Sequence, residues 1–246
     1  MELKTIQDVA TASGDDAVIM WTAQGLRAGV RAWASDGAVA VACPDLNRRD
    51  RLAVRGPAHQ VAELVRQVRP ELGPSYRLLG ERPLVAEVVR RVPGAEVVGT
   101  FEWMDTAGNG SGGSGRDGEA GWLGPESDAE VTALLAQASP SAWAVPGLTG
   151  IRRWAGIRDA AGTLAAVAAD AWSTPRVGFV AGVATAPALR GRGLGEAVCR
   201  FVLGALAAEH ERVALMVDTD NQSAIRLYER LGMRIRPVAA AALTSP

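Results

Sequence analysis

Lysine is nearly absent from this chain, and histidine, cysteine and tyrosine are scarce. Lys4 is the only lysine among 246 residues, and the sequence contains two histidines, two cysteines and two tyrosines. A phosphate-binding P-loop requires a lysine directly after its last glycine, so this composition excludes that motif. Two dispersed cysteines and two histidines make neither a disulfide framework nor a visible metal cluster. The sequence therefore predicts no bound metal.

A strong charge bias and a long apolar segment are also missing. The formal net charge is −1, which gives no sign of a nucleic-acid surface built from charge. No apolar run approaches the roughly 20 residues that cross a bilayer. The first residues, Met1–Thr5, lack the apolar core of a signal peptide. These absences favour a cytoplasmic protein with neither a nucleic-acid partner nor a membrane partner.

The most distinctive motif is a glycine-rich run at Arg190–Gly195, between a predicted strand at 177–185 and a predicted helix at 196–209. Alternate glycines leave the backbone N–H groups open to a phosphate at the positive end of the helix. The spacing does not fit the dinucleotide-binding fingerprint, which requires Gly-x-Gly-x-x-Gly. The run therefore indicates either a phosphorylated ligand or a structural turn in which glycines adopt positive φ.

A second motif follows a short apolar strand predicted at 213–217. Asn221 precedes a predicted helix that carries Tyr228 and is followed by Gly232, a residue typical of helix C-termini. Asn221 and Tyr228 are seven positions apart, so two helical turns bring them to one face. Taken alone, the pair is also explained by a capping asparagine and a buried tyrosine.

Together the two motifs resemble the acyl-CoA-binding segment of the GNAT acetyltransferase superfamily. The family's loop has the pattern Arg/Gln-x-x-Gly-x-Gly/Ala, which Arg190, Gly193 and Gly195 match, and Asn221 and Tyr228 follow in the family's order and spacing. The resemblance covers residues 122–243 and is most specific over 177–233. It extends more weakly to proteins with a degenerate N-terminal GNAT half, such as the glycine N-acyltransferase-like group.

The resemblance implies acyl-CoA, such as acetyl-CoA, as the co-substrate. It assigns the pantetheine arm to Asn221 and protonation of the leaving thiolate to Tyr228. A phenol with a pKa near 10 stays protonated at neutral pH and can donate that proton. Solvated roles explain the two loop arginines equally well. The backbone implied to bind the pantetheine and the thioester belongs to Val183, Ala184 and Thr185, and the residues implied to hold the pyrophosphate are Arg190, Gly191, Arg192, Gly193, Leu194 and Gly195.

No general base is evident on the strand before the loop. Many family members place a glutamate there, whereas residues 177–185 contain no carboxylate. Asp170 on the preceding predicted strand and Glu102 on the last N-terminal strand are the two candidates, although each is also explained as a solvated carboxylate. A water chain, or an amine that arrives neutral, would need no dedicated base.

A glycine- and serine-rich tract at 107–118 divides the chain as a predicted linker. Strands and helices alternate in residues 1–106, and a complete GNAT-like order follows in residues 119–246. We therefore expect an α/β (α+β) protein with a mixed, mostly antiparallel central sheet flanked by helices. Residues 119–246 are the expected catalytic domain, and residues 1–106 are a smaller α/β part that resembles a degenerate GNAT half.

The sequence thus predicts an N-acyltransferase that moves an acetyl or other short acyl group to an amine of a small molecule or peptide. Two other classes stay open. One is a GNAT-fold enzyme with a different donor or reaction, such as an aminoacyl-tRNA-dependent transferase or a hydrolase-like enzyme, and the other is a non-catalytic acyl-CoA sensor. The intact loop favours CoA, the near-neutral charge disfavours tRNA, and Tyr228 disfavours a sensor. A monomer and a homodimer fit equally well.

Overall fold

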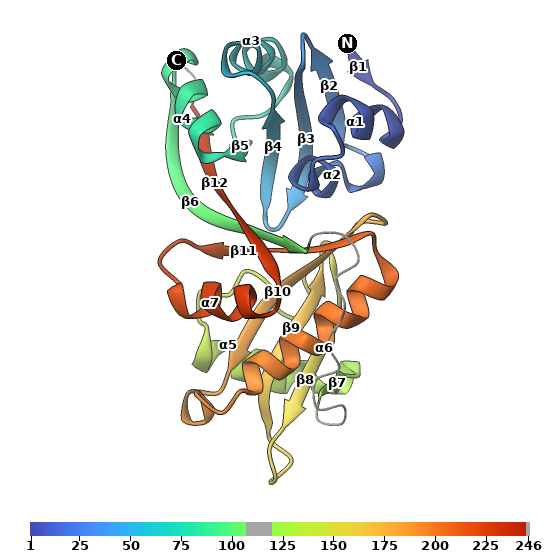
Figure 1. Cartoon of the computed structure of the whole chain (residues 1–246), viewed down its shortest axis with the longest axis vertical. Coiled ribbons are helices and arrows are strands. Elements are labelled where there is room, and N and C mark those ends of the chain that lie inside the picture. Colours follow the sequence, from blue (N-terminus) through green and yellow to red (C-terminus); the bar gives the residue numbers. More distant parts are fainter. Residues whose placement is uncertain (107–119, 245–246) are drawn as a thin grey trace. The chain divides into compact units, whose positions relative to one another are not determined.

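The structure is a computed structural model that describes residues 1–106 and 120–244, so the predicted linker at 107–118 lies outside the described residues. The chain forms two compact units, each with its own strands and covering helices (Figure 1). We call them the N-terminal unit (Met1–Met104, Met216–Gln222 and Ile235–Pro246) and the central unit (Asp105–Leu215 and Ser223–Arg234).

The N-terminal unit is built on strands in the order β1-β2-β3-β4-β5-β12-β6. Its strands are β1 (Glu2–Leu3), β2 (Arg31–Ser35), β3 (Ala38–Leu46), β4 (Arg49–Arg55), β5 (Arg77–Glu81), β6 (Ala95–Thr106) and β12 (Met233–Leu243). Its helices are α1 (Ile6–Ser13), α2 (Ala17–Ala23), α3 (Ala58–Val68) and α4 (Arg82–Arg91), with short 3-10 turns η1 (Gln24–Leu26) and η2 (Arg69–Glu71).

Two short helices at the start of this unit are fixed by their caps. The Thr5 hydroxyl accepts from the Asp8 N–H, and the Asp8 carboxylate accepts from the Thr5 N–H, each at 3.1 Å. This reciprocal pair satisfies two N–H groups at the start of α1. Asp16 caps α2 by accepting from the Val18 N–H at 2.9 Å and from the next N–H at 3.1 Å. The Asp16 carboxylate is thereby buried at a fixed position.

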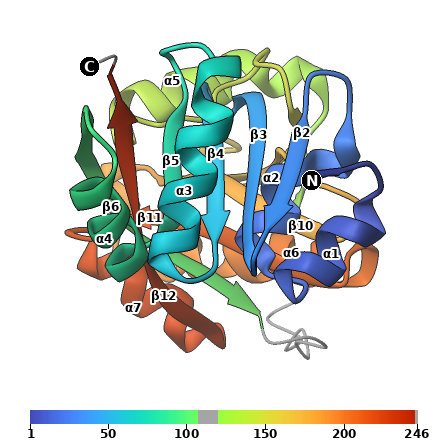
Figure 2. The ribbon, with the colours of Figure 1, turned by 90° about the horizontal axis from the view of Figure 1, so that it is seen from above.

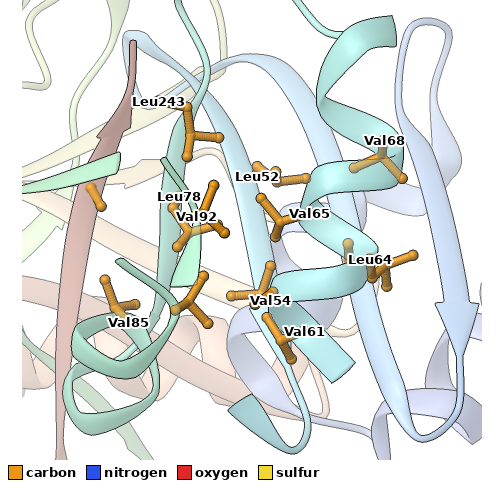
Figure 3. Close-up of a cluster of buried hydrophobic side chains, with 14 of the residues drawn as sticks. Leu52, Val54, Val61, Leu64, Val65, Val68, Leu78, Val85, Val92 and Leu243 are labelled. Atoms are coloured by element: carbon orange, nitrogen blue, oxygen red, sulfur yellow. The ribbon is translucent and has the colours of Figure 1, made fainter. Parts of the chain in front are cut away.

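The core of the N-terminal unit lies between its sheet and α3, which crosses in front of β4 (Figures 2 and 3). Alternate residues of β4 point to this side, because side chains of a strand alternate between faces. Leu52 and Val54 therefore meet the apolar stripe of α3. That stripe consists of Val61, Leu64, Val65 and Val68, at the spacing of an amphipathic helix.

The central unit is built on strands in the order β11-β10-β9-β8-β7. Helix α6 crosses in front of β8 and β9 in Figure 1. Its strands are β7 (Ala120–Trp122), β8 (Ile151–Arg158), β9 (Leu164–Ala171), β10 (Val177–Thr185) and β11 (Arg212–Asp218). Its helices are α5 (Asp128–Ala138), α6 (Leu194–Glu209) and α7 (Gln222–Arg230), with 3-10 turns η3 (Pro125–Ser127) and η4 (Pro187–Leu189).

The two units share one local topology. In the N-terminal unit, β2, β3 and β4 are antiparallel neighbours, and α3 then connects β4 to the parallel strand β5. In the central unit, β8, β9 and β10 are antiparallel neighbours, and α6 connects β10 to the parallel strand β11. A helix follows the parallel strand in both cases, α4 in one and α7 in the other.

This architecture confirms the predicted fold class, a mixed and mainly antiparallel sheet flanked by helices. The compact units, however, are not continuous stretches of the chain. Strand β12 pairs with β5, from Val238 opposite Glu81 to Ala242 opposite Arg77. The last strand thus completes the sheet of the N-terminal unit, and the domain boundaries at 106 and 119 stay a prediction.

Candidate active site

A bulge in β10 shapes the end of the strand that precedes the glycine run. The register between β9 and β10 shifts between Ala181 and Ala184, and Gly182 lies there at a φ of +62°. A side chain at Gly182 would place its Cβ 2.5 Å from the Trp154 ring, so only glycine fits. Bulges of this kind re-aim the strand that carries them.

The strand beyond this bulge contains the three residues predicted to bind pantetheine. Ala184 and Thr185 pair with Val167 and Ala166 of β9. On the other side of β10, the pairing with β11 in the described residues runs from Val177 opposite Arg212 to Val180 opposite Leu215. Backbone groups of Val183 and its neighbours lie beyond this pairing, and their binding of pantetheine stays a prediction.

The glycine run forms an open turn at the start of α6. Gly191 and Gly193 have φ values of +78° and +81°, which is the conformation that the alternative explanation, a structural turn, requires. A Cβ at either position would meet no atom within 4 Å, whereas a Cβ at Gly195 would lie 2.9 Å from the Thr185 hydroxyl. Gly195 thus lets the helix approach β10 closely, and the other two glycines leave space above the backbone.

The backbone N–H groups of this turn, at the N-terminus of α6, lack hydrogen-bond acceptors within the described part of the protein. The Ala197 N–H donates to the Gly193 carbonyl at 2.9 Å. Within the described part of the chain, the N–H groups of residues 191–196 have no acceptor. Unpaired donors at the positive end of a 16-residue helix can bind an anion, so the geometry permits the predicted pyrophosphate site, which stays a prediction.

The two arginines of the loop have different surroundings. Arg190 donates from Nη2 to the Ala138 carbonyl at 2.9 Å, so it fastens the loop to α5. The Arg192 side chain is exposed and has no partner among the described residues. Arg192 is therefore the arginine available to add positive charge beside a bound phosphate.

Tyr228 lies on α7 and is 6% exposed. Burial, and to a smaller extent the neighbouring Cys199 thiol, raises the pKa of its phenol well above the ordinary value of 10.0. Its hydroxyl has no hydrogen-bond partner among the described residues. A protonated phenol without a hydrogen-bond partner in the protein can donate its proton to a ligand.

An ion pair fastens α7 to the first turn of α6. Arg230 Nη2 lies 3.1 Å from Glu196 Oε2, and Arg200 binds the other Glu196 oxygen at 3.0 Å.

Cys199 is buried in α6, and burial raises its pKa to about 12. The thiol is therefore a small core residue, and it does not act as a thiolate at neutral pH.

Asn221 lies immediately before α7, at the position that a capping residue occupies. Its N–H donates to the Asp218 carbonyl at 3.0 Å in the preceding turn. By contacts this turn belongs to the N-terminal unit. Both interpretations of Asn221, as a cap and as a pantetheine ligand, fit its place in the chain, so its binding role stays a prediction.

The two candidate bases differ in how their oxygens are used. Asp170 is fully buried, with Oδ2 3.2 Å from Arg153 Nε and Oδ1 accepting from the Ser173 hydroxyl at 2.5 Å. Glu102 is 7% exposed and receives Arg82 Nη2 on Oε1 at 2.8 Å, while its buried Oε2 has no partner in the described residues. Glu102 therefore has one carboxylate oxygen without a hydrogen-bond partner in the described residues, whereas both oxygens of Asp170 are hydrogen-bonded.

The comparisons with known proteins agree with this geometry. Residues 129–233 match the model of the acetyltransferase (GNAT) family. Residues 129–233 are therefore a GNAT acetyltransferase domain, as the two motifs indicated. Among curated proteins, none matches the sequence.

Solved structures resemble the chain over nearly its whole length. A protein assigned to the GNAT family of acetyltransferases from Novosphingobium aromaticivorans is 25% identical, with a TM-score of 0.56, and the match covers 92% of this chain and 96% of that one. A GCN5-related N-acetyltransferase from Kribbella flavida is 17% identical, with a TM-score of 0.61 and coverage of 91% and 93%. A GNAT-family acetyltransferase from Colwellia psychrerythraea is 14% identical, with a TM-score of 0.56 and coverage of 98% of both chains.

Neither a metal-binding cluster nor a membrane-spanning helix occurs in the described residues. They contain no group of three or more histidine, cysteine, aspartate or glutamate side chains placed to hold a metal ion. None of the helices in residues 1–106 and 120–244 is long and apolar enough to cross a membrane.

Proposed function

We propose that this chain is an N-acyltransferase that transfers an acetyl or other short acyl group from acyl-CoA to the amine of a small molecule or peptide. The observation that carries this proposal is the open turn at Gly191 and Gly193, whose N–H groups lack internal acceptors at the start of α6. Family membership supports acyl-CoA as the co-substrate in general. The choice of acetyl-CoA and of the acceptor belongs to the proposal.

The binding of acyl-CoA would be divided among the predicted residues. The N–H groups of Gly191–Gly195 hold the pyrophosphate, with added charge from Arg192. The backbone of Val183–Thr185, beyond the bulge, bonds the pantetheine and polarises the thioester carbonyl, and Asn221 holds the pantetheine arm. Backbone donors aimed at the carbonyl stabilise the oxyanion that forms when the amine attacks.

Tyr228 would act as the general acid. When the tetrahedral intermediate collapses, the carbon–sulfur bond breaks and the phenol gives its proton to the leaving thiolate. The role requires a protonated phenol, and burial, which raises the phenol pKa, keeps Tyr228 in that form. General acid catalysis of this kind is worth about 10²–10⁴-fold in rate.

The amine must lose a proton before or during its attack. Of the two predicted bases, Glu102 is favoured over Asp170, since its Oε2 lacks a partner in the described residues and both Asp170 oxygens are bound. A water chain or an amine that arrives neutral remains the alternative to a dedicated base. A cytoplasmic location and a monomeric or homodimeric state stay predictions.

A thiol-release assay tests the proposal. Acetyl-CoA is incubated with the full chain and a panel of amines, amino acids and peptides, and free CoA thiol is measured. At least one amine should release thiol in proportion to an N-acetylated product that mass spectrometry identifies. Thiol release that does not depend on any amine would instead indicate the hydrolase-like activity, and binding of acetyl-CoA without release would indicate a sensor.

A further inference from the structure

The N-terminal unit contains a cavity of about 320 Å³ at the carboxyl ends of its two parallel strands. Val54 and Arg55 end β4 on one side of it, and Gly80 and Glu81 end β5 on the other. Ligands of α/β proteins commonly bind outside the carboxyl ends of parallel strands. The volume lies within the range of about 300–1,000 Å³ that is typical of small-molecule sites.

Two arginines and two carboxylates line this cavity. Asp16, which caps α2, receives Arg55 Nη1 on its second oxygen at 3.0 Å and also receives Arg236 of β12. The Asp16 side chain is 6% exposed, so its negative charge is buried, and Arg55 and Arg236 compensate it. Asp16 therefore holds both guanidinium groups at the cavity wall and has no oxygen left for a ligand.

Glu81 lies opposite Asp16 and is held loosely. Its Oε1 is 3.7 Å from Arg55 Nη1 and 3.6 Å from Arg236 Nη1, which is beyond hydrogen-bond distance. Its side chain is 48% exposed. Exposed pairs at such distances contribute little stability. Glu81 can therefore turn toward an incoming cation without breaking a hydrogen bond.

Arg55 has donors that the protein does not use. Its Nη1 binds Asp16, and its Nε and Nη2 have no partner in the described residues. The remaining wall is apolar, with Val18 of α2, Val54 of β4 and Leu84 of α4. The cavity thus presents a guanidinium donor, a loosely held carboxylate and an aliphatic surface.

We propose that this cavity is a second ligand site, which binds an aliphatic α-amino acid. The ligand carboxylate would bind the guanidinium of Arg55 beside Arg236, its ammonium would pair with Glu81, and its side chain would lie against Val18, Val54 and Leu84. The four charged residues sum to zero, so a neutral zwitterion leaves no charge uncompensated. A simple anion would face Glu81, and a simple amine would face Arg55.

Calorimetric titration of the full chain with L-leucine tests this site. Isovalerate, which lacks the ammonium, and isoamylamine, which lacks the carboxylate, are the matched probes. L-leucine should bind, and each analogue should bind at least about tenfold more weakly, since each loses one charged hydrogen-bonded pair. No heat from L-leucine, or equal binding of isovalerate, would overturn the proposal.

Four substitutions locate the binding. Arg55→Gln should weaken L-leucine at least about tenfold and Glu81→Gln at least about fivefold, because each removes one charge from the pair. Arg90→Gln and Glu87→Gln, an exposed pair on α4, should change binding less than twofold. Glu81 is half-exposed, so its substitution tests the site even if Arg55→Gln fails to fold. Unchanged binding in folded Glu81→Gln would refute the site.

One further variant separates this site from the acyl-CoA turn. Gly193→Glu alters the turn at the start of α6, which contributes nothing to the cavity of the N-terminal unit. L-leucine should bind Gly193→Glu as it binds the unsubstituted chain, whether or not that variant binds CoA. Loss of L-leucine binding in Gly193→Glu together with full binding in Arg55→Gln would mean that leucine occupies the acyltransferase site, and would overturn the proposal.

Discussion

Two strand-to-helix crossovers of the same topology occur in this chain, and they differ in what fills the turn. Gly56 and Pro57 alone connect β4 to α3, whereas residues 186–193 connect β10 to α6. A Cβ at Gly56 would lie 2.5 Å from the Gly37 carbonyl oxygen, while a Cβ at Gly193 would meet nothing within 4 Å. The protein's own backbone occupies the first turn, and the second is open to a ligand.

The helices that follow these turns also differ. Three N–H groups lack acceptors in the described residues at each helix start, 58–60 in α3 and 194–196 in α6. Before α6 the N–H groups of residues 191–193 are also unpaired, whereas Pro57 before α3 has no N–H. After the parallel strand, α7 carries Tyr228, and α4 has no tyrosine. One topology therefore carries the candidate catalytic residues in the central unit, and in the N-terminal unit it borders the proposed amino-acid site instead.

The largest effect is expected from filling the open turn. Gly193→Glu should weaken CoA binding more than about 100-fold, because its side chain occupies the anion position and repels phosphate. Gly162→Glu is the matched control, since Gly162 has the same φ of +81° and equally open surroundings in the turn between β8 and β9. Calorimetry should show normal CoA binding for that control. Equal loss in both would point to strain rather than to the site.

Tyr228→Phe should lower turnover by about 10–10³-fold, because it removes the general acid. Acetyl-CoA binding should change less than about threefold, since the lost interaction is made mainly in the transition state. Steady-state kinetics with an identified amine and calorimetry measure the two quantities. Tyr76→Phe, at the only other tyrosine, is the control and should leave both unchanged. Unchanged turnover in Tyr228→Phe would remove the catalytic assignment.

Gly56→Ala should reduce stability without affecting CoA binding. The added Cβ meets backbone atoms of Gly37 and Ala38 at a φ of +126°, so a loss of about 3 kcal/mol in the free energy of unfolding is expected. Gly191→Ala, in the open turn, should lose only about 1 kcal/mol, from the positive φ alone. Urea denaturation measures both. Similar losses of unfolding free energy in the two variants would contradict the conclusion that the turn at Gly56 is filled and the turn at Gly191 is open.

The last effect appears only at alkaline pH and is absent at neutral pH. The folded chain raises the pKa of Cys199 from 9.0 to about 12, so above pH 9 the unfolded chain releases this proton and the folded chain retains it. The contribution is complete below pH 9 and is lost as pH rises toward 12. Cys199→Ala should remove about 1.4 kcal/mol per pH unit of that decline. Identical slopes in urea denaturation would show that the thiol is not buried.

Local patterns predicted the elements around the candidate site well. The strand at 177–185 coincides with β10, and α6 begins two residues before the predicted start at 196 because Gly193 adopts the left-handed N-cap conformation. Glycine spacing and the Asn221–Tyr228 interval are short-range features. They are therefore visible in the sequence before any fold is known.

Contacts between distant segments were not predictable in this way. The pairing of β12 with β5 depends on which sheet edge receives the last strand, and the sequence of β12 carries no signal for it. The bulge in β10 depends on Trp154 meeting Gly182, and the ion pair of Asp170 depends on Arg153 of a neighbouring strand. Each is a tertiary contact that hydrophobic periodicity does not encode.

Hydrogen exchange with and without CoA tests the central claim most directly, because it reads both crossovers in one unsubstituted sample. At CoA concentrations about ten times Kd, the amides of residues 191–197 should exchange at least about fivefold more slowly. Amides of residues 58–64, at the start of α3, should be unchanged. Protection at α3 with none at residues 191–197 would contradict the account, since the filled turn and not the open one would then bind the ligand.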